Sequence, residues 1–246
     1  MTAHRNVDQP PGPDSAVGAR LPARYAAGWR DFVELTIQSH LQPGASILDV
    51  GSGRSPTVPP AKRPEGCRYV GLDLSVEELA KAPAGSYCEQ IAADVTERRV
   101  ELLDRFDLIV SWQVLEHVKP LDLALRHLHS YLRPGGNMVA LLSGGFSLFG
   151  VLNKVIPAGL GVWAMHRLLG RDPDTVFPAH YDQCHYSALV RLFQPWSRAD
   201  VIPLYRGAGY FKFSRHLQSA YIAYEDWAMR ADHRNLATHY MLDAQR

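Results

Sequence analysis

The sequence is short of cysteine and of net charge, and both shortages exclude classes of protein. Its 246 residues include three cysteines (Cys67, Cys88 and Cys184), which form no C-x-x-C pair and cannot all be joined in disulfides. This usage is typical of a reduced protein, so we expect a cytoplasmic location and cysteines that serve packing. The formal net charge of +1 gives no general attraction for phosphate backbones, so no nucleic-acid partner is expected.

The sequence also lacks an apolar leader and an unbroken apolar span. Residues 1–20 have no apolar core and are rich in Pro, Gly and Asp, so we expect a disordered lead-in and not a signal peptide. No charged residue lies within 135–153, but glycines at 144 and 145 and a proline at 157 interrupt the apolar region. These breaks disfavour a transmembrane helix.

What the sequence does contain is an alternation of apolar runs and helical patterns. Five apolar runs bounded by turn residues are expected to be strands, namely 46–50, 68–74, 88–95, 106–112 and 137–143. All but the third are continuously apolar, as in strands buried on both faces of a parallel sheet, and the third belongs near an edge. Helical spacing at 24–41, 75–82 and 120–136, the last ending in a Pro-Gly-Gly stop, alternates with these runs. The pattern predicts an α/β fold with a doubly wound, mostly parallel sheet, whose ligand lies at the carboxyl ends of the strands.

The alternation stops after residue 143 and returns near the C-terminus. Residues 145–186 contain two apolar helical pieces and an irregular loop, so we expect a helical cap inserted after the fifth strand. A helix at 187–194, a strand at 200–205, a helix at 216–230 and a strand at 236–244 are expected to follow. The sheet then has seven strands, and residues 21–246 are predicted to form one domain that includes the cap.

The first apolar run leads into a glycine turn, SILDVGSGRSPTVPP (46–60). A dinucleotide site requires G-x-G-x-x-G/A, and Gly51 and Gly53 fit, but the sixth position is Pro56. A Walker loop is also excluded, because no Gly-Lys-Ser/Thr follows. Without phosphates to bind, a helix N-terminus is dispensable. The turn instead lets the backbone approach a ligand closely, with Asp49 available to a cationic or hydroxyl partner.

Acidic residues end the next two predicted strands. Asp73 stands twenty residues after Gly53, the place of an acid that binds the ribose hydroxyls of an adenosine cofactor. Asp94 ends the third strand, where a carboxylate is able to accept a bond from an exocyclic amine. The alternatives are structural: Asp73 helps to cap the helix that begins at Ser75, and Asp94 initiates a turn. Acids at three consecutive strand ends, without a phosphate cradle, suit S-adenosylmethionine.

From "ILDVGSG" through "YVGLDLS", "AADVTE", "FDLIVSWQVLEHV" and "LRPGGNMVALL", the sequence resembles the class I S-adenosylmethionine-dependent methyltransferases. The resemblance covers about residues 44–143 and implies a Rossmann-like methyltransferase fold. It also implies that Asp49, Gly51 and Gly53 meet the methionine part of the cofactor.

The resemblance assigns the remaining cofactor contacts to the ends of the next strands. It implies that Asp73, with Leu74, holds the ribose, and that Asp94 reaches the adenine amine with Val95 packing nearby. The end of the fourth strand, Trp112 and Gln113, lines the methionine side. The sequence departs from the family where Ser55 replaces a common third glycine and where prolines shorten the usual first helix.

Histidines and a tyrosine downstream are the candidates for the acceptor side. His117 follows the fourth strand where related enzymes turn a histidine toward the substrate, and the alternative is a structural histidine bonded to backbone. His180 and Tyr181 lie in a loop, 177–186, that either covers the acceptor or anchors the cap. No metal-ligand cluster stands out, so no metal site is predicted.

These observations predict an enzyme that methylates a small molecule, and we expect the methylated atom to be oxygen. The amine-gripping Asn/Asp-Pro-Pro-Tyr/Phe and the Pro-Cys of cytosine-C5 enzymes are both absent. Residues 145–186 are similar to uncharacterised bacterial methyltransferases whose relatives act on saccharides, lipids or secondary metabolites. We therefore expect a hydroxyl acceptor on a saccharide, a lipid-linked molecule or a natural product.

Two alternatives from other classes stay open. The first is a non-catalytic module that keeps the methyltransferase fold and only binds. The second is a peripheral membrane protein that docks through its apolar cap. The cap side chains that favour docking are Leu148, Phe149, Leu152, Ile156 and Trp163.

Overall fold

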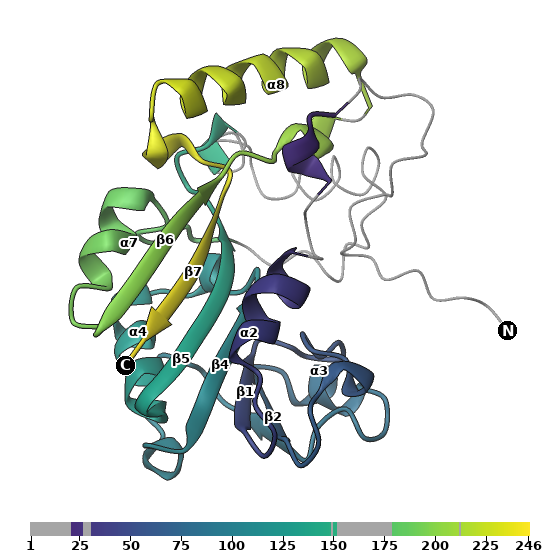
Figure 1. The fold of residues 1–246 in the computed structure, drawn as a ribbon, viewed down its shortest axis with the longest axis vertical. Helices are drawn as coiled ribbons and strands as arrows, with labels where there is room; N and C mark the ends of the chain where they lie inside the picture. Colours follow the sequence, from purple (N-terminus) through teal and green to yellow (C-terminus); the bar gives the residue numbers. More distant parts are fainter. Residues whose placement is uncertain (1–20, 27–30, 149, 152–178, 212) are drawn as a thin grey trace, which may run out of the picture.

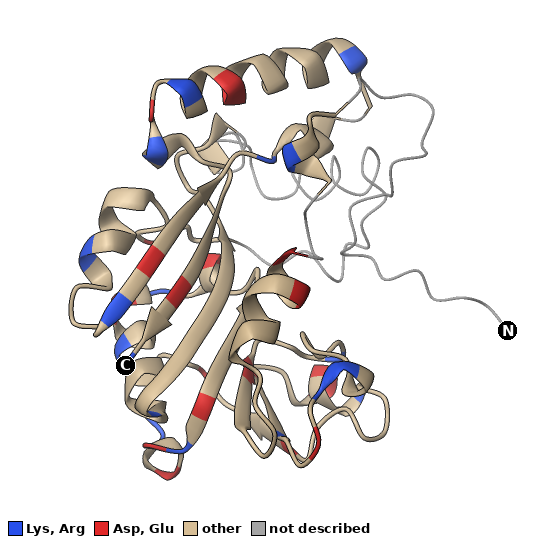
Figure 2. Cartoon of the chain, in the orientation of Figure 1, with Lys and Arg blue, Asp and Glu red and all other residues tan. Residues whose placement is uncertain are grey.

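A computed structural model describes residues 21–26, 31–148, 150–151, 179–211 and 213–246 (Figure 1). Most of the predicted cap falls on residues 149 and 152–178, which lie outside the described residues, as does the predicted lead-in at 1–20. The helical nature of the cap and the single-domain division therefore stay predictions. Charged residues of both signs are interspersed over the described elements (Figure 2), in keeping with the small net charge.

The fold is built on one seven-stranded sheet with the order β3-β2-β1-β4-β5-β7-β6. The strands are β1 (Ser46–Val50), β2 (Arg68–Asp73), β3 (Glu89–Ala92), β4 (Phe106–Trp112), β5 (Leu132–Ser143), β6 (Arg198–Leu204) and β7 (His239–Gln245). The first five are parallel, and β7 runs antiparallel to both of its neighbours. The predicted doubly wound, mostly parallel sheet is confirmed, with the polar β3 at an edge. The strand order reverses between β1 and β4, so the carboxyl ends of these two strands flank the expected ligand crevice.

Helices cover both faces of the sheet. On one face α4 (Leu121–Tyr131) and α7 (Tyr186–Leu192) pack over the side chains of residues 48, 50, 109, 138 and 140. On the other face η2 (Asp31–Ile37) and α2 (Gln38–His40) pack over residues 47, 69, 108, 110 and 139. Neighbouring residues of one strand thus serve opposite cores, which explains why the central strands are apolar without alternation.

The remaining elements are short, apart from one long helix. The short ones are η1 (Ala23–Tyr25), η3 (Pro60–Lys62), α3 (Val76–Ala80), η4 (Val100–Leu102), η5 (Leu115–His117), η7 (Ala208–Phe211) and η8 (Arg234–Leu236). The long helix, α8 (Arg215–Arg230), lies at one end of the molecule beyond the sheet (Figure 1). None of the helices in the described ranges has the length and apolar character needed to cross a membrane.

The boundary between α4 and β5 differs from the prediction. The sequence predicts a helix with a Pro-Gly-Gly stop at 134–136 and a strand from residue 137, but α4 ends at Tyr131 and the strand begins at Leu132. Pro134 cannot donate to a helix, and a Cβ on Gly136 would lie 3.0–3.2 Å from three carbonyl oxygens. The extended segment instead exchanges backbone hydrogen bonds with the last residue, from Gly135 N to Arg246 O (3.1 Å) and from Arg246 N to Gly136 O (2.9 Å). Pairing with the end of the chain therefore overrides the helical pattern.

Candidate functional site

The glycine turn after β1 has a backbone conformation that only glycine adopts readily. Gly51 and Gly53 have φ angles of 72° and 46°. The Gly51 N–H donates to Leu72 O at 2.7 Å, which ties the turn to β2. A Cβ on Gly51 would lie only 2.3 Å from the Val114 side chain, so the backbone here is in close contact with the segment after β4. Both glycines are therefore required by conformation, and one also by packing.

Asp49, at the base of this turn, is fully buried and bonded within the protein. Its Oδ2 accepts hydrogen bonds from Thr57 N (2.6 Å) and Tyr69 Oη (2.6 Å), and its Oδ1 accepts one from Thr57 Oγ1 (2.7 Å). Burial raises the pKa of Asp49 to about 6, although these three bonds favour the charged form. The hydroxyl partners expected for Asp49 thus belong to the chain itself. Direct contact with a cofactor stays a prediction for this residue.

In related folds a helix follows such a turn, and here the proline-rich segment takes its position. The Val58 N–H donates to Tyr69 Oη at 2.9 Å, and Val58 O accepts from both Nε (2.9 Å) and Nη2 (2.7 Å) of Arg63. The Arg63 guanidinium lies 3.5 Å from the centre of the Tyr69 ring, a cation–π contact. Side chains thus replace the intrahelical bonds, and the segment therefore tolerates four prolines, at positions 56, 59, 60 and 64.

Asp73, at the tip of β2, lies directly beside the glycine turn. Its carboxylate accepts hydrogen bonds from the backbone N–H groups of Ser75 (2.9 Å) and Gly53. Burial raises the pKa of Asp73, and these backbone donors oppose the rise. The side chain is only half buried, so it remains open to a ligand. The tips of β1 and β2 therefore bring a carboxylate and a glycine backbone together.

The capping alternative for Asp73 is realised at the same time. Ser75 caps α3 by accepting a hydrogen bond from Glu78 N (3.1 Å), as the sequence pattern predicts. Glu78 does not return a bond to the Ser75 N–H; its carboxylate instead pairs with Arg54 Nε (2.6 Å) and Nη2 (2.7 Å). Asp73 satisfies the Ser75 N–H in its place. Ribose binding and capping are compatible, because an ionised carboxylate accepts about four hydrogen bonds.

The other predicted adenosine contacts line the same edge of the sheet. Asp94 initiates a turn, since its Oδ1 accepts bonds from Thr96 N (2.8 Å) and Thr96 Oγ1 (2.7 Å). Within the described residues its Oδ2 has no hydrogen-bond partner, and the side chain is half buried. Val95 is buried in the core, whereas Leu74 is 74% exposed. A flat apolar ligand over Leu74 would bury surface that now meets water.

The end of β4 carries a strained residue. Gln113 has a φ of 53°, a left-handed conformation that is uncommon outside glycine, and its N–H donates to Leu141 O at 2.7 Å. Trp112 precedes it, is half buried, and meets Phe32 of η2 edge to face with ring centres 4.6 Å apart. This left-handed residue turns the chain away from the sheet beside Gly51. Strained residues of this kind are common at strand ends that bind a ligand.

These residues fit S-adenosylmethionine better than a phosphate-bearing cofactor. Half-buried carboxylates stand at the tips of β2 and β3, where they match ribose hydroxyls and an adenine amine. The first helix after the turn, which binds phosphate in dinucleotide folds, is replaced by the proline-rich segment and the three-residue η3. Two acids and a glycine turn suit a cationic, phosphate-free nucleoside.

Sequence reasoning missed a buried carboxyl next to the candidate His117. Glu116 is 3% exposed; its Oε1 accepts from Ser143 N (3.2 Å), and its Oε2 is buried with no hydrogen-bond partner among the described residues. Burial raises the pKa of Glu116, and the nearby His117 and the bond from Ser143 lower it. His117 ends η5 and is half buried. Only tertiary structure reveals that the acid of this Glu-His pair points into the protein.

His180 and Tyr181 lie beside this acid, but they differ in exposure. The N–H groups of both donate to Glu116 O at 2.9 Å, which fixes their loop to η5. The His180 side chain is exposed, whereas Tyr181 is 7% exposed and belongs to the core. The structure thus favours the anchoring alternative for Tyr181. A direct role for His180 stays a prediction.

A buried histidine lies at the same edge and was also missed. His239 begins β7 opposite Ser143 and Leu204, and its Nε2 lies 3.5 Å from Tyr210 Oη. Burial, assisted by the charge of Arg206, lowers the pKa of His239 to about 4. Its ring is therefore neutral at physiological pH and is able to share a proton with Tyr210. It carries no recognisable sequence motif.

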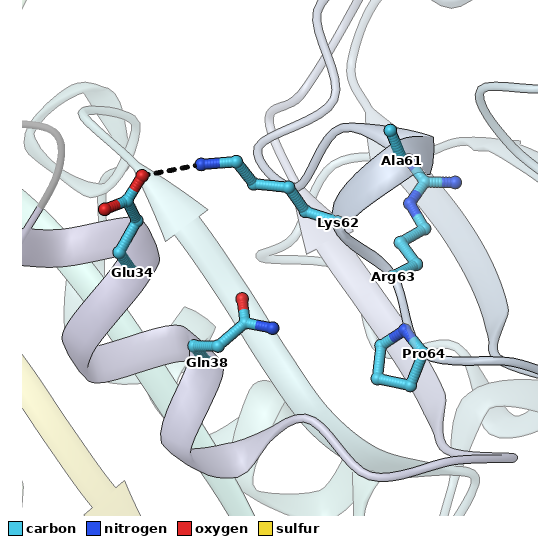
Figure 3. A pocket seen from close by; sticks show the side chains of 6 residues that line it. All are labelled: Glu34, Gln38, Ala61, Lys62, Arg63 and Pro64. Atoms are coloured by element: carbon cyan, nitrogen blue, oxygen red, sulfur yellow. Dashed lines mark hydrogen bonds and ion pairs between the residues drawn. The ribbon is translucent and has the colours of Figure 1, made fainter.

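A hollow of about 450 Å³ lies elsewhere, between η2–α2 on one side and η3 with the two residues after it on the other. Its lining residues are Glu34, Gln38, Ala61, Lys62, Arg63 and Pro64. Lys62 Nζ and Glu34 Oε1 form an ion pair across it at 2.8 Å (Figure 3). None of the strand-tip acids lines this hollow, so we do not place the cofactor there. Nor does the described part of the chain bring together three His, Cys, Asp or Glu side chains suited to a metal.

The fold and the strand-tip site define the class: a Rossmann-like methyltransferase. The sequence profile of the methyltransferase-domain family matches residues 22–194. This chain therefore belongs to that family and is a class I S-adenosylmethionine-dependent methyltransferase. The resemblance found in the sequence is confirmed.

Curated relatives match part of the chain. A ubiquinone biosynthesis O-methyltransferase of Nitrobacter winogradskyi is 33% identical over 100 residues, which are 39% of this chain and 38% of that protein. A protein of the same name from Bradyrhizobium sp. is 31% identical over 123 residues, or 49% of this chain and 48% of that one. The chain thus matches between two fifths and half of the length of these relatives.

Solved structures share the fold at low identity. Phosphoethanolamine N-methyltransferase 2 of Haemonchus contortus, in complex with S-adenosylmethionine, has a TM-score of 0.54 and 14% identity over 89% of this chain and 53% of its own. The geranyl diphosphate C-methyltransferase of Streptomyces coelicolor has a TM-score of 0.53 and 14% identity over 90% and 76%. The [4+2]-cyclase SpnF has a TM-score of 0.55 and 16% identity over 89% and 80%. At such identities the likeness is one of fold alone.

Proposed function

We propose that this protein transfers the methyl group of S-adenosylmethionine to a hydroxyl group of a small molecule. The observation that carries the proposal is the contact between Gly53 and Asp73, which joins the glycine turn of β1 to the acid of β2. In this arrangement Asp73 accepts bonds from the ribose hydroxyls and Asp94 accepts one from the adenine amine. The backbone of Gly51 and Gly53 approaches the methionine part.

The cofactor supplies an electrophilic methyl group on a sulfonium that is a good leaving group. The protein has then to align a nucleophile with this methyl and to exclude water. Trp112 and Gln113 line the methionine side at the end of β4. His117, which follows them, accepts the proton of the acceptor hydroxyl as its oxygen forms the new bond to carbon. Glu116 is too deeply buried to touch the acceptor.

Oxygen as the methylated atom rests on the curated relatives, which are named O-methyltransferases. For the acceptor itself we keep three classes: a saccharide, a lipid-linked molecule and a natural product. The relatives named for ubiquinone biosynthesis support testing a phenolic hydroxyl on an apolar molecule first. The alternative is a module that binds the cofactor without turnover, which the presence of a cyclase among proteins of this fold keeps open.

Calorimetric titration with S-adenosylmethionine and S-adenosylhomocysteine tests the cofactor site first. Isotope-labelled methyl transfer to a panel of phenols, saccharides and lipid-linked hydroxyls, read by mass spectrometry, then tests the reaction. Micromolar binding of both nucleosides with label on an acceptor oxygen would support the proposal. Binding without transfer to any acceptor would favour the non-catalytic module, and no binding of either nucleoside would contradict both.

A further inference from the structure

Several large apolar side chains are exposed on and beside α8. Leu217 and Trp227 on this helix are each 50% exposed, and Phe213 just before it is 47% exposed. Leu148 and Val151, from the segment after β5, are each 43% exposed. We call these five residues the α8 surface. Scattered apolar side chains are common on soluble proteins, so the question is whether these five lie together.

Helical spacing and one contact bring them together. Leu217, Tyr224 and Trp227 are separated by seven and three positions, which places them along one stripe of the helix, and Phe213 lies just before the N-cap Ser214. A hydrogen bond joins the Tyr224 hydroxyl to the backbone of Leu148, so the segment after β5 lies against the same stripe. The helix is fastened through another face, on which Gln218, Tyr221, Glu225 and Ala228 are buried.

The charges around this stripe are positive. Arg215 and Arg230 stand exposed at the two ends of α8, with the acidic residues between them (Figure 2). Neither acid of the helix is free: Glu225 is fully buried and accepts from Gly207 N (2.6 Å) and Thr238 Oγ1 (2.6 Å). The other, Asp226, pairs with Arg24 at 2.6 Å. The exposed part of α8 therefore combines an aromatic and aliphatic stripe with an arginine near each end of the helix, and neither arginine forms an ion pair with another described residue.

We propose that the α8 surface docks the protein on an anionic lipid bilayer, with α8 lying in the plane of the interface. Tryptophan, tyrosine and leucine on one side of a helix, flanked by arginines, match an interface that is apolar inside and negatively charged outside. A second copy fits less well. Antiparallel packing of two α8 helices would set Arg215 of one copy against Arg230 of the other, without a free acid to pair them.

The position of α8 gives the docking a consequence for the site. The helix joins the carboxyl end of β6 to the start of β7, so it lies at the edge of the sheet that carries the strand-tip acids (Figure 1). Docking through α8 would bring this edge close to the lipid and would favour an acceptor that is dissolved in the bilayer. The docking itself does not depend on the reaction, so binding and turnover are tested separately.

Vesicle flotation of the full chain tests the proposal. We expect the protein to float with vesicles of phosphatidylcholine and phosphatidylglycerol, and to stay in solution with phosphatidylcholine alone. Added salt should weaken the binding, because surface charges are screened. The double variant Leu217→Glu, Trp227→Glu should bind about tenfold less, since it removes the apolar stripe and repels the lipid. Val100→Glu, at a 70% exposed valine outside the surface, is the matched control and should bind as the parent does.

Two further measurements guard against misfolding of that variant. Arg215→Gln, Arg230→Gln keeps the apolar stripe and should lose the dependence on phosphatidylglycerol. The emission of Trp227, obtained as the difference between the parent and Trp227→Phe, should shift to shorter wavelength on vesicles. Equal flotation of the folded glutamate variant and the parent would overturn the proposal. So would an unchanged Trp227 emission, or a dimer in solution that the same substitutions dissociate while no vesicles are bound.

Discussion

Asp49 accepts two hydrogen bonds from Thr57, one from the backbone N–H at 2.6 Å and one from the hydroxyl at 2.7 Å. The acid that the resemblance assigns to the cofactor thus also holds the proline-rich segment against the sheet. We therefore expect the stability of the glycine turn to depend on the protonation state of the buried Asp49 carboxyl.

The pH dependence of stability tests this position of Asp49. Burial raises its pKa to about 6 from an ordinary value of 3.8, so between these values the folded protein binds more protons than the unfolded chain. The free energy of unfolding contributed by this group should therefore fall by about 3 kcal/mol as pH rises through the window. Asp49→Asn should abolish that fall. Urea unfolding at pH 4.5 and pH 7 would measure it, and parallel pH dependences of variant and parent would contradict it.

Gly51→Ala should destabilise the protein by about 3 kcal/mol, because the new Cβ meets Val114 and the φ angle is left-handed. Gly85→Ala is the matched control: it has a φ of 80° and no atom within 4 Å, so it should cost only about 1 kcal/mol. Adding Val114→Ala to Gly51→Ala should recover part of the difference. Thermal unfolding of the four proteins measures the effect, and equal losses for the two glycine variants would exclude the packing argument.

Asp73→Ala should abolish cofactor binding and leave the fold intact, because a half-buried strand-tip acid contributes little to the core. Isothermal titration with S-adenosylhomocysteine provides the measurement. Glu65→Gln, an exposed acid before the other end of β2, serves as control and should keep the parent affinity. Affinity of Asp73→Ala within about threefold of the parent, well under 1 kcal/mol, would show that the ribose is bound elsewhere.

His117→Ala should keep cofactor affinity and lower kcat by about two orders of magnitude, as expected for loss of a general base. His129→Ala, at the far end of α4, is the control and should retain turnover. A variant that no longer folds would instead indicate the structural alternative for His117. Titration with S-adenosylhomocysteine and circular dichroism separate the two outcomes.

Glu116→Gln should make stability less sensitive to pH. The raised pKa means that the folded protein holds this proton more tightly than the unfolded chain, so the contribution of Glu116 falls as pH rises above its ordinary value of 4.5. Glutamine keeps an acceptor for Ser143 N and removes the ionisation, so the stability of the variant relative to the parent should increase as pH rises above 4.5. Glu116→Ala, without that acceptor, should lose about 2 kcal/mol throughout. An unchanged pH profile for Glu116→Gln would contradict the assignment.

Much of the sheet was predictable from the sequence, because a strand buried on both faces has to be apolar at every position. This condition marked β1, β2, β4 and the later part of β5, and the more polar β3 was correctly expected at an edge. The glycine turn and the acids at 73 and 94 were also predictable, since strand order and spacing bring them to one edge. The predicted start of the fifth strand at residue 137 was five residues too late, because the pairing of its first part involves Arg246, which lies far away in the sequence.

The sequence by itself determined the class, since the order of strands, turn and acids is local information. Only the tertiary structure decided which polar groups the protein uses for itself. In the folded protein Asp49 accepts hydrogen bonds from Thr57 and Tyr69, Glu116 is buried next to His117, and His239 lies beside Tyr210. These partners are separated by up to 29 residues along the chain, except for the adjacent Glu116 and His117. Burial and hydrogen bonding depend on neighbours in space, and no pattern along the chain records them.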